Sequence, residues 1–374
     1  MKKILLAALV STAAPAMATT AERAPAGTLD DGTPVEAVVL RNANGVSATV
    51  ITYGATLQSL IAPDREGNAE EITLGYDTAA EYASKPNYFG VTVGRYANRI
   101  ANGSFRIGDA EYQAPQNDGS NSLHGGTVGF DKRNFRILSV SDGPTAKVVM
   151  GLTSEDGDQG YPGTLEVKVT YTLDEEGSLT IMFDAATDKP TVVNMTNHAI
   201  FNLAGDGDPA GTSNHMLTIP AAAFTSVDEN LIPTGELTPV EGTVFDFRQP
   251  RLVAEGLRDG SNPQIVLGRG YDHNFALDKG QTTQPELAAR LEDPVSGRVL
   301  EVLTTEPGVQ FYTGNFLDGT LSGRSGRIYR MGDGIALEPQ KFPDTPNQPA
   351  FGSALVTPDK PYRHVMIYRV STAD

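Results

Sequence analysis

Short runs that alternate apolar and polar residues recur along most of this chain. Segments such as ATVITYG, LEVKVTYTLD and HVMIYRV have the period of a half-buried β-strand. The turn-forming stretches DEEG, SEDGDQG and DPVSG stand between such runs and predict antiparallel hairpins. Helical periodicity is nearly absent, and only residues 77–84 predict one or two helical turns. The sequence therefore predicts an all-β fold, a large antiparallel β-sandwich of extended sheets rather than a small barrel.

Residues 1–18, MKKILLAALVSTAAPAMA, have the features of a cleavable secretory signal peptide. Two lysines precede an apolar stretch, and the stretch ends in the small-x-small cleavage site Ala16-Met17-Ala18. The apolar stretch is too short for a membrane-spanning helix. We expect cleavage after Ala18, a flexible leader over residues 19–28, and a single β-sandwich domain over residues 29–374. This organisation predicts an exported protein, periplasmic or secreted.

The charge and the absence of cysteine exclude several classes of partner and site. A formal net charge of −17 at pH 7 argues against nucleic acid and membrane surfaces, because both attract basic patches. With no cysteine, the chain has no disulfide, thiolate metal site or cysteine nucleophile. Neither feature predicts an oligomeric state.

Polar and ionisable residues concentrate in five stretches of this otherwise apolar β-type sequence. The stretches are GRYANRIANGSF with Asn98 and Arg99, NDGSNSLHGGTVGFDKRNF with His124, NMTNHAIFNLAG with His198, GYDHNFAL with Asp272 and His273, and GIALEPQKF with Glu338.

Each of these residues has a structural interpretation beside a functional one. His198 lies in an apolar, β-prone run, which suits either a hydrogen-bonded core residue or a proton carrier in a pocket. Glu338 follows three apolar residues, and a carboxylate at the end of a buried strand needs partners or a raised pKa, so it is a candidate general base. Arg99 by itself favours a surface ion pair in an acidic protein. His124 precedes a Gly-Gly turn and suits either the turn or a ligand contact.

The remaining histidines favour structural roles. His215 and His364 lie in ordinary strand sequence. Asp272 and His273 are neighbours in a strand, so at most one of them points into a given pocket. Known metal and nucleophile motifs are also missing: the chain has no H-E-x-x-H, no EF-hand loop, no G-x-S-x-G elbow and no phosphate loop. We therefore predict no metal site.

Taken together and in order, the motifs resemble those of the aldose 1-epimerase (galactose mutarotase) family. They are GRYANRI, NSLHGGTVGFDK, GYPG, TNHAIFNLAG, LIPTGE, YDHNFAL, EPGVQFYTGN and ALEPQKFPDTPN. The resemblance covers almost the whole chain after the leader. It implies a galactose mutarotase-like supersandwich that interconverts the α and β anomers of free aldohexoses of the glucose and galactose type. It also implies that the partner is a free monosaccharide and that no cofactor is needed.

The resemblance also implies roles for individual residues. It makes His198 the general acid and Glu338 the general base, which open and close the pyranose ring by moving two protons. The residues that hold the sugar hydroxyls are then Asn98, Arg99, His124 and Asp272, with Gln310 of GVQFYTGN nearby.

The sequence departs from the family pattern at three sites. Ile200 replaces a common tyrosine, Pro339 a common threonine, and Asn134-Phe135 stand where an aromatic residue is frequent. They leave the shape of the pocket and the preferred aldose open.

Two alternative functions also fit parts of the sequence. A non-catalytic carbohydrate-binding protein would not need both His198 and Glu338. A glycosidase usually needs two carboxylates, and here only Glu338 has a clear case.

Overall fold

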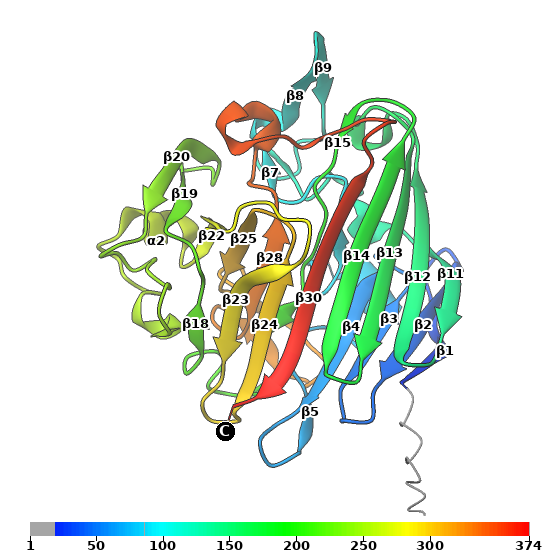
Figure 1. Ribbon diagram of the computed structural model, residues 1–374, viewed down its shortest axis with the longest axis vertical. Helices are drawn as coiled ribbons and strands as arrows, with labels where there is room; N and C mark the ends of the chain where they lie inside the picture. The colour runs from blue at the N-terminus through cyan, green and yellow to red at the C-terminus, as the bar shows by residue number, and fades with distance from the viewer. Residues whose placement is uncertain (1–18, 86, 374) are drawn as a thin grey trace, which may run out of the picture.

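A nine-stranded antiparallel sheet forms one layer of the protein (Figure 1). The computed structural model describes residues 19–85 and 87–373. In sheet order the strands are β11 (Arg136–Ser141), β12 (Thr145–Ser154), β13 (Leu165–Asp174), β14 (Ser178–Thr187), β30 (Tyr362–Thr372), β24 (Arg298–Thr304), β23 (Glu286–Glu292), β18 (Met216–Thr218) and β21 (Arg251–Leu252). Burial alternates along β13, β14 and β30. This confirms the half-buried strands predicted from LEVKVTYTLD, which lies in β13, and HVMIYRV, which lies in β30.

A five-stranded and a six-stranded antiparallel sheet lie side by side behind this layer (Figure 1). The five-stranded sheet contains β1 (Thr20–Thr28), β2 (Pro34–Arg41), β3 (Ser47–Ile51), β4 (Thr56–Pro63) and β5 (Ala69–Glu71). The six-stranded sheet contains β17 (Ile200–Phe201), β28 (Ile335–Gln340), β25 (Gly308–Tyr312), β22 (Asp272–Ala276), β19 (Ala223–Val227) and β20 (Pro233–Pro239). A bridge between Thr73 and Phe201 joins the two sheets.

The main hydrophobic core lies between the two layers. β2 and β4 pack on β12 and β30, and β28 and β25 pack on β24 and β23. Buried side chains from all three sheets form one continuous cluster, which includes Val38, Leu60, Phe183, Tyr368, Leu300 and Phe311. Two stacked sheets around one core are a β-sandwich, so the predicted fold class is confirmed.

Short elements connect and cover the large sheets. The two-stranded sheets pair β7 (Arg99–Ile100) with β10 (Ser122–Leu123), β6 (Thr92–Val93) with β16 (Thr196–Asn197), β15 (Thr191–Val192) with β29 (Leu355–Val356), β8 (Ser104–Ile107) with β9 (Ala110–Gln113), and β26 (Asp318–Ser322) with β27 (Ile328–Arg330). The described residues include two α-helices, α1 (Ala79–Ser84) and α2 (Pro263–Gly268). In α1, Thr78 and Glu81 form a capping box, which confirms the helical turns predicted at 77–84.

The flexible leader predicted for residues 19–28 is wrong, because the structure places this segment in a sheet. Thr19 bridges to Gly143, and β1 pairs with β2 along most of its length. Most β1 side chains are exposed or half-buried, so backbone hydrogen bonds rather than apolar burial hold the strand. An alternating sequence pattern reveals strands that bury one face, but it does not reveal strands held only by backbone hydrogen bonds. This polar, alanine-rich segment therefore showed no strand pattern.

The predicted signal peptide, residues 1–18, lies outside the described residues. Within residues 19–85 and 87–373, no helix has the length and apolar character needed to cross a membrane.

Candidate active site

One face of the six-stranded sheet carries polar side chains, and the opposite face packs into the core. Cross-strand partners share a face, and the register pairs Asp272 with Tyr312 and Gln310 with Glu338. Phe311 and Leu337 alternate with these residues and belong to the main core cluster. The register therefore brings together three of the predicted site residues, which come from β22, β25 and β28.

Loops from the first third of the chain close over this face and add Asn98 and His124. The two residues bond each other reciprocally: the His124 N–H donates to the Asn98 carbonyl at 3.1 Å, and the Asn98 N–H donates to His124 Nδ1 at 3.1 Å. The glycine after His124 lies directly against another loop, because a Cβ at Gly125 would be 2.0 Å from the carbonyl oxygen of Gly94. The turn after His124 thus packs against the protein's own backbone.

The Asn98 N–H also fixes the protonation of His124. Nδ1 accepts that hydrogen bond, so the neutral ring carries its proton on Nε2. Burial is the main cause that lowers the pKa of His124 well below its ordinary value, with smaller contributions from His198 and Arg99. His124 is therefore a permanent hydrogen-bond donor rather than a proton carrier.

Arg99 lies in the pocket, so the surface ion pair that its sequence favoured is wrong. Its side chain is 8% exposed, and Nε donates to Asp118 Oδ2 at 2.7 Å. Nη1 lies 3.9 Å from Asp272 Oδ2, and the other Asp272 oxygen accepts a 2.7 Å bond from Gln310 Nε2. Arg99 and Asp272 thus face each other as donor and acceptor, a combination that can hold sugar hydroxyls.

His198 and Glu338 meet in the same pocket. His198 follows β16, and its backbone is held by bonds to Val91 and Gly90. Its Nε2 lies 3.5 Å from Glu338 Oε1, and both side chains are almost fully buried. Within the described part of the chain, His198 Nδ1 and Glu338 Oε2 are buried without a hydrogen-bond partner. Buried polar atoms are normally paired, so these two are suited to contact a polar ligand.

Burial shifts the two pKa values in opposite directions. Desolvation disfavours charge, so it lowers the pKa of His198 to about 4. Desolvation also raises the pKa of Glu338 well above its ordinary value, and the charge of Asp272 adds to this shift while Arg99 opposes it. Both shifts favour neutral forms, an imidazole and a protonated carboxyl. Burial therefore favours the state in which the pair holds a single proton, on the Glu338 carboxyl.

These residues line a cavity of about 310 Å³, near the lower end of the volumes typical of small-molecule sites. Six of the seven predicted residues line it. The seventh, Gln310, is not a lining residue, and its Nε2 donates a hydrogen bond to Asp272. Sequence reasoning missed several lining side chains, among them Tyr88, Asp118, Tyr312 and Phe316. Tyr312 could have been found, because it lies two residues beyond Gln310 and strand alternation puts both on one face. Asp118 gave only a turn signal.

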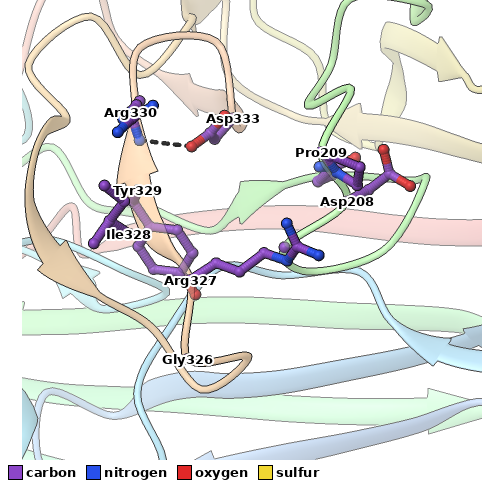
Figure 2. Close-up of a pocket in the computed structure, with 10 residues that line it drawn as sticks. Asp208, Pro209, Gly326, Arg327, Ile328, Tyr329, Arg330 and Asp333 are labelled. Atoms are coloured by element: carbon purple, nitrogen blue, oxygen red, sulfur yellow. Dashed lines mark hydrogen bonds between the residues drawn. The ribbon is translucent and has the colours of Figure 1, made fainter.

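A second cavity, of about 440 Å³, lies where β27 faces the loop at 207–209 (Figure 2). Its charged side chains are Asp208, Arg327, Arg330 and Asp333. In Figure 2 the side chain of Arg327 extends toward Asp208 and Pro209. Arg327 and Arg330 are exposed, and the cavity contains none of the predicted site residues. Its volume is larger, but it has no buried acid–base pair.

His124, His198 and Glu338 also form a group of three potential metal ligands, with donor atoms within 4.8 Å of one another. The hydrogen bond to Asn98 argues against this use, because His124 Nε2 carries a proton and has no lone pair for a metal. The two remaining side chains are fewer than the three or four protein ligands of ordinary zinc sites.

The other histidines lie outside the pocket. His215 Nε2 accepts a hydrogen bond from the Leu203 N–H, and His364 bonds to Thr304 and to the Met195 carbonyl. His273 packs edge-on against Phe224 and Phe245 on the core side of β22. This confirms that only one of the Asp272 and His273 neighbours points into the pocket.

Comparison with known proteins agrees with this geometry. The family model described as aldose 1-epimerase matches residues 36–369. The galactose mutarotase of Mus musculus is 46% identical over 91% of this chain and 96% of its own, and the aldose 1-epimerase of Escherichia coli is 40% identical over 85% and 90%. The crystal structure of galactose 1-epimerase from Lactobacillus acidophilus superposes with a TM-score of 0.83 at 29% identity, over 96% of this chain and 100% of that chain. This chain belongs to the aldose 1-epimerase family.

Proposed function

We propose that the protein is an aldose 1-epimerase that interconverts the α and β anomers of free aldohexoses of the glucose and galactose type. The observation that carries the proposal is the 3.5 Å approach of His198 Nε2 to Glu338 Oε1 inside a buried pocket. The pocket also contains a donor and an acceptor for hydroxyl groups, Arg99 and Asp272. Relatives described as galactose mutarotase and aldose 1-epimerase support the same activity.

The reaction needs one acid and one base close together. Opening a pyranose breaks the bond between C1 and the ring oxygen, while the C1 hydroxyl loses its proton and the ring oxygen gains one. Both oxygens are attached to C1, so two catalytic atoms 3.5 Å apart can each contact one of them. The open aldehyde then turns about the C1–C2 bond and closes on its other face, which reverses both proton transfers.

In our proposal His198 gives the proton to the ring oxygen and Glu338 accepts the proton of the C1 hydroxyl. The pKa shifts strengthen both groups in these roles, because a lowered pKa makes imidazolium a stronger acid and a raised pKa makes carboxylate a stronger base. After ring opening the pair is neutral, which is the state that burial favours. The same shifts therefore stabilise the pair while the sugar is in its open form.

Polarimetry tests this assignment directly. Freshly dissolved α-D-glucose or α-D-galactose should reach anomeric equilibrium faster with the protein than in buffer alone. His198→Asn and Glu338→Gln keep the approximate size of each side chain, and each should lower kcat/KM by about 10²- to 10⁴-fold. His215→Asn is the matched control, because His215 is a buried histidine outside the pocket, and its folded protein should stay active.

Three results would contradict the proposal. Sugar binding in a calorimeter without faster mutarotation would indicate a carbohydrate-binding protein. Release of sugar from an aryl glycoside would indicate a glycosidase. Near-normal activity in both His198→Asn and Glu338→Gln would remove the two residues from the mechanism.

We also propose that the protein is exported, with cleavage after Ala18. The lysines, apolar stretch and small-x-small site of residues 1–18 support this. Such a cut would leave Thr19 as the first residue, where the contacts with Gly143 begin. Mass spectrometry of the protein from a periplasmic or culture fraction should find Thr19 at the N-terminus; an uncleaved chain retained in the cytoplasm would refute the proposal.

A further inference from the structure

Asn194 lies where the segments that supply the pocket residues meet. It is fully buried and precedes His198 by four residues. Its backbone N–H donates to the Arg95 carbonyl at 2.9 Å, and its carbonyl accepts from the Ala97 N–H at 2.7 Å. These backbone bonds tie the segment that leads to Asn98 to the segment that leads to His198.

The Asn194 side chain adds a third segment, the end of the strand that carries Glu338. Its Oδ1 accepts from the Lys341 N–H at 2.9 Å, and its Nδ2 donates to the carbonyls of Lys341 at 3.3 Å and Ala97 at 3.2 Å. The Asn194 side-chain amide thus bonds to both backbone polar groups, N–H and C=O, of Lys341, which lies three residues after Glu338.

These bonds replace strand pairing at the point where it stops. The register of β28 with β25 ends at Gln340, paired with Gly308. Lys341 is the next residue, and its backbone N–H and C=O both bond to the Asn194 side chain. An apolar side chain of similar size could pack at position 194 but would leave these two groups unpaired.

We propose that Asn194 is a positioning residue that sets the distance between His198 and Glu338. The inference rests on the proposed function, since it assigns those two residues to the proton transfers. Removing the side chain releases the end of β28 and loses one bond to the Ala97 carbonyl, whereas the two backbone bonds of Asn194 to Arg95 and Ala97 remain. The acid–base pair should therefore lose its alignment while the groups at 98–99 keep their place.

Kinetics of Asn194→Ala test this inference. We expect kcat to fall about 10- to 100-fold, because proton transfer is sensitive to small misplacements, while KM changes less than about threefold. Asn194→Asp keeps the size and the acceptor for the Lys341 N–H but loses the donor, so its kcat should lie between those of Asn194→Ala and the wild type. A purely structural role would lower the thermal stability and the active fraction without lowering kcat of the folded protein.

Asn42→Ala is the matched control. The Asn42 amide also joins two segments, donating to the Asp174 carbonyl at 3.0 Å and accepting from the Val46 N–H at 2.9 Å, but it contacts no pocket segment. It should lower the Tm and leave kcat unchanged.

The outcomes separate the inference from the proposed function. No acceleration by the wild-type protein would refute the function and the inference together. An active wild type with kcat of Asn194→Ala within about threefold of normal would refute the inference alone. Equal losses of kcat in Asn194→Ala and Asn42→Ala would refute it too. If Asn194→Ala does not fold, Asn194→Asp decides, and a kcat equal to that of the wild type would refute the inference.

Discussion

Lys341→Met should destabilise the protein measurably, because it leaves a buried charge without its partner. Lys341 Nζ lies 3.1 Å from Glu306 Oε2, and the Glu306 side chain is 0% exposed. Removing one partner of a buried ion pair costs about 3–5 kcal/mol. Lys279 Nζ lies nearby and donates to the Glu306 carbonyl at 2.8 Å, so it offsets part of the unpaired charge. We therefore expect a loss near the lower limit, about 3 kcal/mol.

Differential scanning calorimetry can measure this loss. The unfolding entropy is about 2.1 cal/mol/K per residue, or about 0.8 kcal/mol/K for a chain of this size, so the Tm should fall by about 4 °C. Adding Glu306→Gln in the same chain removes the unpaired charge and should recover much of the difference. A fall in Tm of less than about 1 °C, or a double variant no more stable than Lys341→Met, would refute the reasoning.

Three further predictions concern the pocket. The pH profile of kcat/KM should be bell-shaped. The acid limb should lie near pH 4, where His198 becomes protonated while Glu338 still holds its proton. The alkaline limb should lie well above the ordinary glutamate pKa, where Glu338 loses its proton. An acid limb near the ordinary histidine pKa of about 6.5 would contradict this assignment. Asp272→Asn removes a negative charge that raises the pKa of Glu338, so the alkaline limb of its residual activity should move to lower pH; a shift to higher pH would contradict this. Arg99→Lys loses the guanidinium that bonds Asp118 and faces Asp272, so KM should rise about tenfold with a smaller effect on kcat, and initial rates over a range of sugar concentrations would show it.

The predictable part of the fold was the part whose stability comes from burial. Buried and exposed residues alternate along β13, β14 and β30 because one side of each strand faces the core, and the sequence shows this as alternating apolar and polar residues. β1 does not alternate in this way, since it is held by its backbone, and it was missed. The helix α2 was also missed, although Asn262 caps it and Pro263 occupies its first turn, a combination that does signal a helix start.

The sequence could predict which residues form the site but not how they contact one another. Motif resemblance selected seven residues, and the structure places six of them on the wall of one cavity. The resemblance could not show that Gln310 donates a hydrogen bond to Asp272, because that contact depends on the register of β22 and β25. Asn194 gave no signal either. Its role comes from bonds to residues 97 and 341, which lie far from it in the sequence.

The pairing of β1 with β2 determines how the protein responds to proteolysis near its N-terminus. β1 covers the edge of β2, whose N–H and C=O groups would otherwise be open to a strand from another molecule. A protease that cut after Thr28, instead of at the proposed site after Ala18, would remove β1 and uncover that edge. Such a trimmed protein would self-associate increasingly as its concentration rises.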